Sequence, residues 1–344
     1  MVDINGGRVA VGAPSDNGVG AVHLFDSTTG NLLRTIANPD TTDGAGDRFG
    51  AVVALDPTGT LLLVGAVHDD DGGGADSGAA YLFDAITGSL LRSFDNPNPD
   101  ANDFFGTSVA IDGDYLLVGA PGGGGDDSGA AYLYNLTSGT PTTPVQTLLI
   151  PVADLINGDG EFGQGESISA TGIVVGAPIA DPSGVNDAGA AYFYTLNTTN
   201  DTVSAPTRLT SDDLDTGDDF GVVVAIDGTT IAVTSTLDDG PGDTVMDTGA
   251  VFTFDSSDIN NTRVRIDNAD INPDPFDNFG SWVDVSGDRL LVGANAEDVN
   301  ANDNAGQAFL FDISGASPSL LRQFENPDPD TDDRFGNSVA LDGL

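Results

Sequence analysis

The sequence predicts an all-β protein, a β-propeller of four-stranded antiparallel blades, and two observations lead to this fold class. A Phe-Gly pair recurs six times at intervals of 56 to 59 residues, and each interval holds short apolar or alternating runs separated by Gly, Asn and Asp. No helical periodicity separates these runs, as a parallel sheet with crossover helices would require. Because the repeats fill the chain of 344 residues, we expect a single domain.

Each repeat supplies four predicted strands in a constant order. The first begins at the Phe-Gly pair, and the second is an apolar run that ends near Val-Gly-Ala-Pro, as at residues 118–121. The third follows a Gly-Ala pair and carries alternating aromatic residues, and the fourth is an outer strand such as residues 90–94. Tight links such as Asp112-Gly113 and Thr87-Gly88 have the composition of hairpin turns. The predicted units are 1–48, 49–104, 105–161, 162–219, 220–278 and 279–334, with a closing strand at 335–344.

Six repeats favour six blades, although the N-terminal unit has no Phe-Gly pair. Residues 335–343 supply its first strand if one blade is completed from both chain ends, but residues 2–6 resemble the same strand. This redundancy indicates a fragment of a longer chain and leaves a truncated seven-bladed ring as the alternative. A large ring at a strand entrance can fix one sheet against the next, so we expect burial at the blade junctions of Phe49, Phe105, Phe162, Phe220 and Phe279.

The order of Phe-Gly, apolar strand and Gly-Ala-Pro resembles the FG-GAP repeat of integrin α subunits, over essentially the whole chain. The resemblance implies a propeller, seven-bladed in integrins, with adhesion or matrix-type contacts outside the cell. Integrin-type repeats bind Ca²⁺ in an Asp-x-Asp/Asn-x-Asp-Gly loop between strands one and two. Here a short turn at residues 111–114 takes that place, and the nearest match, residues 157–161, precedes Phe162 on the other face.

The chain is strongly acidic, with 54 Asp and Glu residues against 10 Arg and no Lys. Such a surface repels polyphosphates, so we expect neither nucleic acid nor an anionic membrane as a partner. No apolar run is long enough for a membrane insertion. Only four of the acids are Glu, and Asp is favoured in turns and as a ligand of hard cations. The Asp-rich loops therefore have a specific role, or the protein comes from a high-salt habitat.

The acids concentrate in the connections between strands two and three and between strand four and the next blade, which lie on one face of a propeller. In the second kind of connection, Asp and Asn recur at alternate positions. Oxygen ligands so spaced suit Ca²⁺; alternatively, they form solvated turns. The candidate metal ligands are Asp100, Asn102, Asp103, Asp270, Asn272, Asp274, Asp328, Asp330, Asp332 and Asp333.

We do not expect an enzyme. The chain has no Cys, and its two histidines are His23, in an aromatic strand position, and His68, in a loop. These leave little material for a nucleophile and base or for a zinc site. The expected function is an extracellular or cell-surface binding or adhesion module, monomeric within a larger chain, that presents an acidic, Ca²⁺-loaded loop face to a protein or glycan. The alternatives are a structural repeat unit of a large surface protein and an accessory domain of a secreted hydrolase or lyase.

Overall fold

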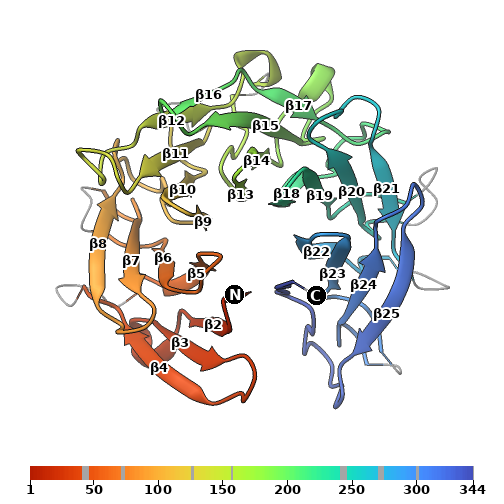
Figure 1. Cartoon of the computed structure of the whole chain (residues 1–344). Coiled ribbons are helices and arrows are strands. Elements are labelled where there is room, and N and C mark those ends of the chain that lie inside the picture. The colour runs from red at the N-terminus through yellow and green to blue at the C-terminus, as the bar shows by residue number, and fades with distance from the viewer. Residues whose placement is uncertain are drawn as a thin grey trace.

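The computed structural model describes residues 1–40, 46–70, 74–124, 128–155, 158–240, 246–269, 275–299 and 302–343. Six antiparallel sheets are arranged radially around a central axis (Figure 1). Apart from strands, the described residues form only three short 3-10 turns, at Asp16–Gly18, Val152–Asp154 and Pro182–Gly184. The predicted fold class, an all-β propeller of six four-stranded antiparallel blades, is confirmed.

Each blade is a meander that runs from an inner strand to the rim of the propeller. Blades 1 to 3 consist of β1 (Val2–Asn5), β2 (Arg8–Ala13), β3 (Ala21–Asp26) and β4 (Leu32–Ala37); β5 (Phe49–Leu55), β6 (Leu61–Ala66), β7 (Ala79–Asp84) and β8 (Leu90–Asp95); and β9 (Val109–Asp112), β10 (Tyr115–Ala120), β11 (Ala130–Asn135) and β12 (Gln146–Leu149). Blades 4 to 6 consist of β13 (Glu166–Ser169), β14 (Gly172–Ala177), β15 (Ala190–Asn197), β16 (Thr202–Val203) and β17 (Thr207–Leu209); β18 (Phe220–Asp227), β19 (Thr230–Ser235), β20 (Ala250–Asp255) and β21 (Val264–Asp267); and β22 (Phe279–Ser286), β23 (Arg289–Ala294), β24 (Gln307–Asp312) and β25 (Ser319–Glu325). In blade 4 the outer position is shared by β16 and β17, which both pair with β15.

Glycines in the second strand and directly before the third strand explain why the repeat keeps its Gly-Ala pairs. A Cβ atom added to Gly65 would lie 2.1 Å from the carbonyl oxygen of Gly106, and one added to Gly78 would lie 2.0 Å from that of Phe105. The Phe-Gly backbone of blade 3 thus packs directly on glycines of blade 2, and the second-strand contact recurs at Gly12, Gly119, Gly176 and Gly293, whereas blade 5 has Thr234 at this place. Only a residue without a side chain permits this approach, so the motif is a contact between neighbouring blades.

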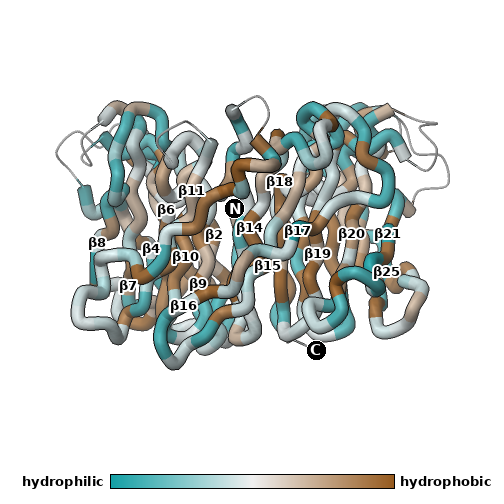
Figure 2. The backbone as a smooth tube through the Cα atoms, turned by 90° about the horizontal axis from the view of Figure 1, so that it is seen from above, coloured by the Kyte–Doolittle hydropathy of each residue, from teal (hydrophilic) through white to brown (hydrophobic). Residues whose placement is uncertain are grey.

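The phenylalanine rings of the Phe-Gly pairs fill the junctions between blades, as predicted. Phe49, Phe105, Phe162, Phe220 and Phe279 are all 0% exposed. The Phe49 ring lies 5.8 Å from that of Tyr81 and 5.9 Å from that of Phe83, both edge-on and both on the third strand of its own blade. Hydrophobic residues follow the strands in Figure 2, and hydrophilic ones gather in the loops at their ends.

The two chain ends occupy separate positions beside the axis (Figure 1). Strand β1 pairs with β2, with Val2 opposite Val11, so the N-terminal residues supply the inner strand of blade 1. Residues 335–343 do not complete this blade. They take a seventh place around the central channel, which has a volume of about 820 Å³ and is lined by seven segments, the six inner strands with their flanking residues and residues 337–343.

Candidate cation site

The predicted metal ligands of the loop before blade 3 lie close together, but one of them serves the loop itself. The Oδ2 atom of Asp103 accepts hydrogen bonds from the Asn96 side chain at 2.7 Å and from the Asp100 backbone at 2.8 Å. Asn102 takes a left-handed backbone conformation with φ of +66°. The Asp103 carboxylate therefore closes a turn within a single loop.

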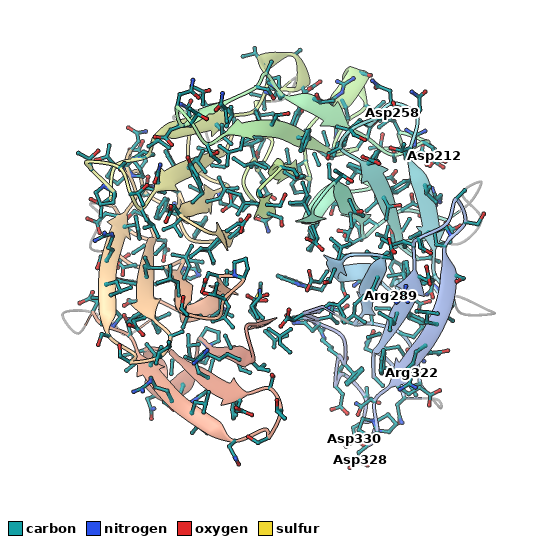
Figure 3. All side chains as sticks on the ribbon, viewed as in Figure 1. Asp212, Asp258, Arg289, Arg322, Asp328 and Asp330 are labelled. Atoms are coloured by element: carbon teal, nitrogen blue, oxygen red, sulfur yellow. The ribbon has the colours of Figure 1, made fainter. Side chains whose placement is uncertain are left out.

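The loop after blade 6 repeats this arrangement on the surface. The Oδ2 atom of Asp333 accepts hydrogen bonds from the Asn326 side chain at 2.9 Å and from the Asp330 backbone at 2.8 Å. Figure 3 shows Asp328 and Asp330 at the outer end of this loop, and both are exposed, as are Asp332 and Asp333. The third predicted set, Asp270, Asn272 and Asp274, lies outside the described residues.

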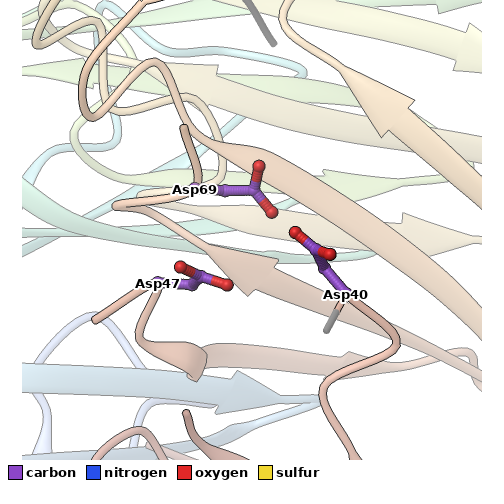
Figure 4. Close-up of side chains that lie close together, drawn as sticks. All are labelled: Asp40, Asp47 and Asp69. Atoms are coloured by element: carbon purple, nitrogen blue, oxygen red, sulfur yellow. The ribbon is translucent and has the colours of Figure 1, made fainter. Parts of the chain in front are cut away.

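The structure brings together a different set of acids, from two loops at the junction of blades 1 and 2. One carboxylate oxygen from each of Asp40, Asp47 and Asp69 lies within 4.8 Å of the others, the only such group in the described part of the chain. In Figure 4 the three carboxylates point toward one another. Asp47 and Asp69 are buried and Asp40 is half-buried. This acidic triad was not singled out from the sequence, because Asp69 comes from the loop after β6, whereas Asp40 and Asp47 come from the loop between β4 and β5.

Ordered donors surround the acidic triad. The Asn38 side chain donates to Oδ2 of Asp47 at 2.8 Å, and the Tyr81 hydroxyl donates to Oδ2 of Asp69 at 2.7 Å. Burial, and then the hydrogen bond and charge of Asp69, raise the pKa of Tyr81 far above its usual value, so the hydroxyl stays a neutral donor. The backbone amide of His68 donates to the Asp47 carbonyl at 3.1 Å and holds the two loops together.

The corresponding junction before blade 5 carries an arginine among its acids. Asp218 and Asp238 occupy the places of Asp47 and Asp69 relative to the Phe-Gly pair and the second strand. The guanidinium of Arg265 binds Asp238 through Nη2 and lies 3.1 Å from Oδ1 of Asp213 through Nη1. Burial tends to lower the pKa of Arg265, but hydrogen bonds to Asp267 and Asp238 outweigh it and raise the pKa. Burial and the Asp238 charge raise the pKa of Asp218 to about 7.

Blade 4 uses the same device, and blade 2 does not. Arg208 stands opposite Tyr192 in the sheet and reaches Oδ1 of Asp154 at 2.5 Å. Arg265 likewise stands opposite Phe252 on the neighbouring strand. In blade 2 the residue in this register, opposite Tyr81, is Ser93. The fourth strand thus supplies a guanidinium to two junctions and a small hydroxyl to the junction that holds the acidic triad.

The junctions before blades 3 and 6 keep the Asp two residues before the Phe-Gly pair, as Asp103 and Asp277, and differ in the residue at the place of Asp69. In blade 3, Gly123 stands where blade 2 has Asp69. In blade 6, the Asn268 side chain donates to Oδ2 of Asp277 at 3.1 Å and to Oε2 of Glu297 at 3.0 Å. The loop that integrin-type repeats use for Ca²⁺ is here the two-residue turn between β9 and β10, on the opposite face. The acidic triad is therefore not a copy of that loop.

Comparison with known proteins identifies the repeat. The model of the FG-GAP repeat matches residues 41–83, 97–134, 204–254 and 272–311, which make up half of the chain. None of the curated proteins matches the chain. Within the described residues, no helix has the length and apolar character needed to cross a membrane. Together with the Phe-Gly and Gly-Ala contacts at the blade junctions, the match shows that the chain belongs to the FG-GAP repeat family.

Proposed function

We propose that this propeller is a non-enzymatic binding module, extracellular or on a cell surface, whose acidic loop face binds Ca²⁺ at the acidic triad and is presented to a protein or glycan. FG-GAP propellers often serve extracellular binding, which supports the location and the class of partner. The observation that carries the metal proposal is the approach of Asp40, Asp47 and Asp69 to within 4.8 Å. The sequence-predicted ligands in other loops make no comparable group among the described residues.

The arginines of two other junctions, before blades 4 and 5, support a cation at the acidic triad. Gathering carboxylates in a buried place is unfavourable unless positive charge compensates them. In blade 5 Arg265 pairs with both Asp213 and Asp238, and in blade 4 Arg208 pairs with the buried Asp154. Blade 2 carries Ser93 at the same register, so we expect a free cation to take the place of the guanidinium.

The ligand chemistry of the acidic triad favours Ca²⁺ over transition metals. Its side chains offer carboxylate oxygens, and the surrounding loop adds backbone and amide oxygens, such as Oδ1 of Asn38, which accepts from the Asp40 amide at 3.1 Å. Ca²⁺ accepts six to eight oxygen ligands in irregular geometry, whereas zinc sites are built mainly from Cys and His. The nearby His68 directs Nδ1 to Asp76 at 2.6 Å.

Moving the arginine tests the proposal directly. Ser93→Arg places a guanidinium at the register that Arg208 and Arg265 occupy, so Ca²⁺ binding measured by calorimetry should be lost while the fold is kept. Thr147→Arg is the matched control, because it adds the same charge opposite Tyr132 in blade 3, where Gly123 replaces the acid. Its Ca²⁺ affinity should equal that of the unmodified protein. Unchanged Ca²⁺ binding in both Ser93→Arg and Asp69→Asn would overturn the site.

A further inference from the structure

We propose that a cavity at the outer side of the junction of blades 4 and 5 binds one acidic sugar residue, a uronic acid, through its carboxylate. The cavity has a volume of about 270 Å³. Arg208 and the two residues after it line one side, and Phe254 and the connection between β20 and β21, which ends at Arg263, line the other. In Figure 1 the outer strands β17 and β21 mark this part of the rim. The cavity lies at a different junction from the acidic triad, and its ligand does not depend on the cation proposal.

The charge of the cavity wall is opposite to that of the chain as a whole. The wall contains two of the ten arginines and none of the 54 acids. Arg208 pairs with the buried Asp154 through Nη1. Arg263 instead donates through Nη1 to the carbonyl oxygens of Thr210 and Ser211, at 3.4 and 2.9 Å. The charge of Arg263 thus has no carboxylate partner among the described residues, and its Nε and Nη2 atoms are left for an anion.

The cavity exists because this junction differs from that of blades 1 and 2. There, Arg34 on β4 lies across the connection between β7 and β8: its Nη2 donates to the Ile86 carbonyl at 2.8 Å, and a Cβ atom on Gly88 would lie 2.4 Å from its Cδ atom. In blade 4 the residue in the register of Arg34 is Thr207, which is too short to reach across. The space that an arginine fills at the first junction is therefore open at the second.

The connection that lines the cavity is longer than its counterpart and is held in one shape. It comprises residues 256–263, against 85–89 in blade 2. Oγ1 of Thr262 accepts from the Asp255 amide at 2.8 Å and donates to the Asp258 carbonyl at 2.9 Å. The side chain of Asp258, labelled at the rim in Figure 3, accepts from the Asn261 side chain at 2.7 Å. A wall ordered before the ligand arrives loses less entropy on binding.

The rest of the wall suits a sugar better than a bare anion or an acidic side chain. Asn260 and Thr210 line the cavity, and their side chains make no hydrogen bond to other described residues. An amide and a hydroxyl can both donate to and accept from sugar hydroxyls. The nearly buried Leu209 and Phe254 add apolar atoms for the face of the ring.

The size of the cavity limits the ligand to one sugar residue. Its volume lies below the range of about 300–1,000 Å³ that is typical of pockets for drug-sized ligands. The guanidinium of Arg263 can meet a carboxylate with two parallel hydrogen bonds. A uronic acid combines this carboxylate with the ring and hydroxyls that the other residues of the wall can contact.

A ligand-observed NMR titration of the full chain with sodium glucuronate tests the proposal. In about 0.15 M NaCl, repulsion by the net charge of −44 is screened beyond about 8 Å. Glucuronate should bind at least about tenfold more tightly than acetate, which has only the carboxylate, and than glucose, which has only the ring and hydroxyls. Arg263→Gln should weaken glucuronate binding at least about tenfold, because it removes hydrogen bonds to a charged group.

Matched variants separate this site from other effects of charge. Arg322→Gln, on the exposed strand β25, and Asp69→Asn, in the acidic triad, should both bind glucuronate as the unmodified chain does. Because Arg263 also holds two backbone carbonyls, the exposed Asn260→Leu is the second variant and should weaken binding about fivefold. The proposal is overturned if glucuronate does not bind, or if acetate or sulfate binds as tightly, which would leave a simple anion site. It is also overturned if Arg263→Gln and Asn260→Leu both keep the affinity of the unmodified chain.

Discussion

The guanidinium of Arg265 binds the buried carboxylate of Asp238 through Nη2. Asp238 takes the place in blade 5 that Asp69 takes in blade 2, where the residue in the register of Arg265 is Ser93. The side chain of Arg265 is only 13% exposed, and its Nε donates to Asp267 at 2.6 Å. One arginine therefore serves acids from both loops of its junction.

Arg265→Ser should destabilise the protein and make its stability depend on cations. Breaking a buried ion pair by removing one partner costs about 3–5 kcal/mol, because the remaining charges are left uncompensated. Urea unfolding in a chelator should show this loss, and millimolar Ca²⁺ should restore part of it if the junctions are equivalent. Arg322→Ser, on the exposed strand β25, is the control and should cost less than about 1 kcal/mol. A similarly small loss for Arg265→Ser would mean that the arginine does not compensate the acids.

Phe220→Ala should cost about 3–5 kcal/mol in the free energy of unfolding, because it leaves a cavity at the junction of blades 4 and 5. Phe220 is 0% exposed and its ring lies 5.5 Å from that of Phe252. Phe335→Ala makes the same change at the last Phe-Gly pair, where the ring is 36% exposed, and should cost much less. Denaturant titration of both variants measures the difference. Equal losses would mean that the Phe335 ring is buried as fully as the Phe220 ring.

The strands could be predicted from the sequence because the information for each lies within one repeat. Phe49 and Gly65 have counterparts at similar spacings in most repeats, and their burial follows from a contact that most junctions between blades repeat. The position of residues 335–343 could not be settled in this way, because residues 2–6 carry the same pattern. Only the pairing of β1 with β2 decides between them.

The candidate cation site was harder to predict, because spacing within one loop says little about approach between loops. Asp328 and Asp330 alternate as ligands should, yet they remain exposed at the end of one loop. Asp47 and Asp69 meet because the chain before β5 packs on the turn after β6. A usable signal was present: an Asp stands two residues before most Phe-Gly pairs, and an acid often stands three residues after the second strand. Which of these positions approach one another depends on how the loops pack.

The stability of the protein should respond to Ca²⁺ beyond the effect of ionic strength. A formal charge of −44 makes screening by any salt stabilising, and this effect needs about 0.1 M salt. A specific site adds about 2.7 kcal/mol at a hundredfold excess of Ca²⁺ over its dissociation constant. Melting temperatures in millimolar CaCl₂, MgCl₂ and NaCl matched for ionic strength separate the two effects.

Two sets of substitutions locate that response. Asp69→Asn should abolish the extra gain from Ca²⁺, whereas the joint change of Asp328, Asp330 and Asp332 to Asn should leave it, because these exposed side chains share a single loop. If the triple variant loses the gain and Asp69→Asn keeps it, Ca²⁺ binds the exposed loop instead. If CaCl₂ does no better than matched NaCl, the acidic face is a solvated surface.

Burial of the Glu166 carboxyl should make the protein less stable as the pH rises. It is a buried carboxyl in β13 at a place where other inner strands carry valine, as at Val53 and Val224. Burial raises its pKa well above the ordinary value of 4.5, so above pH 4.5 the folded chain holds a proton that the unfolded chain has released. The free energy of unfolding therefore decreases from about pH 4.5 up to the raised pKa, by at most about 1.4 kcal/mol per pH unit for one proton. Glu166→Gln should reduce this slope, to which Asp218 also contributes, and raise stability at pH 7. Glu325→Gln, exposed on β25, should change neither. Urea unfolding between pH 4 and 8 measures both variants, and an unchanged slope in Glu166→Gln would show that other buried acids carry the extra protons.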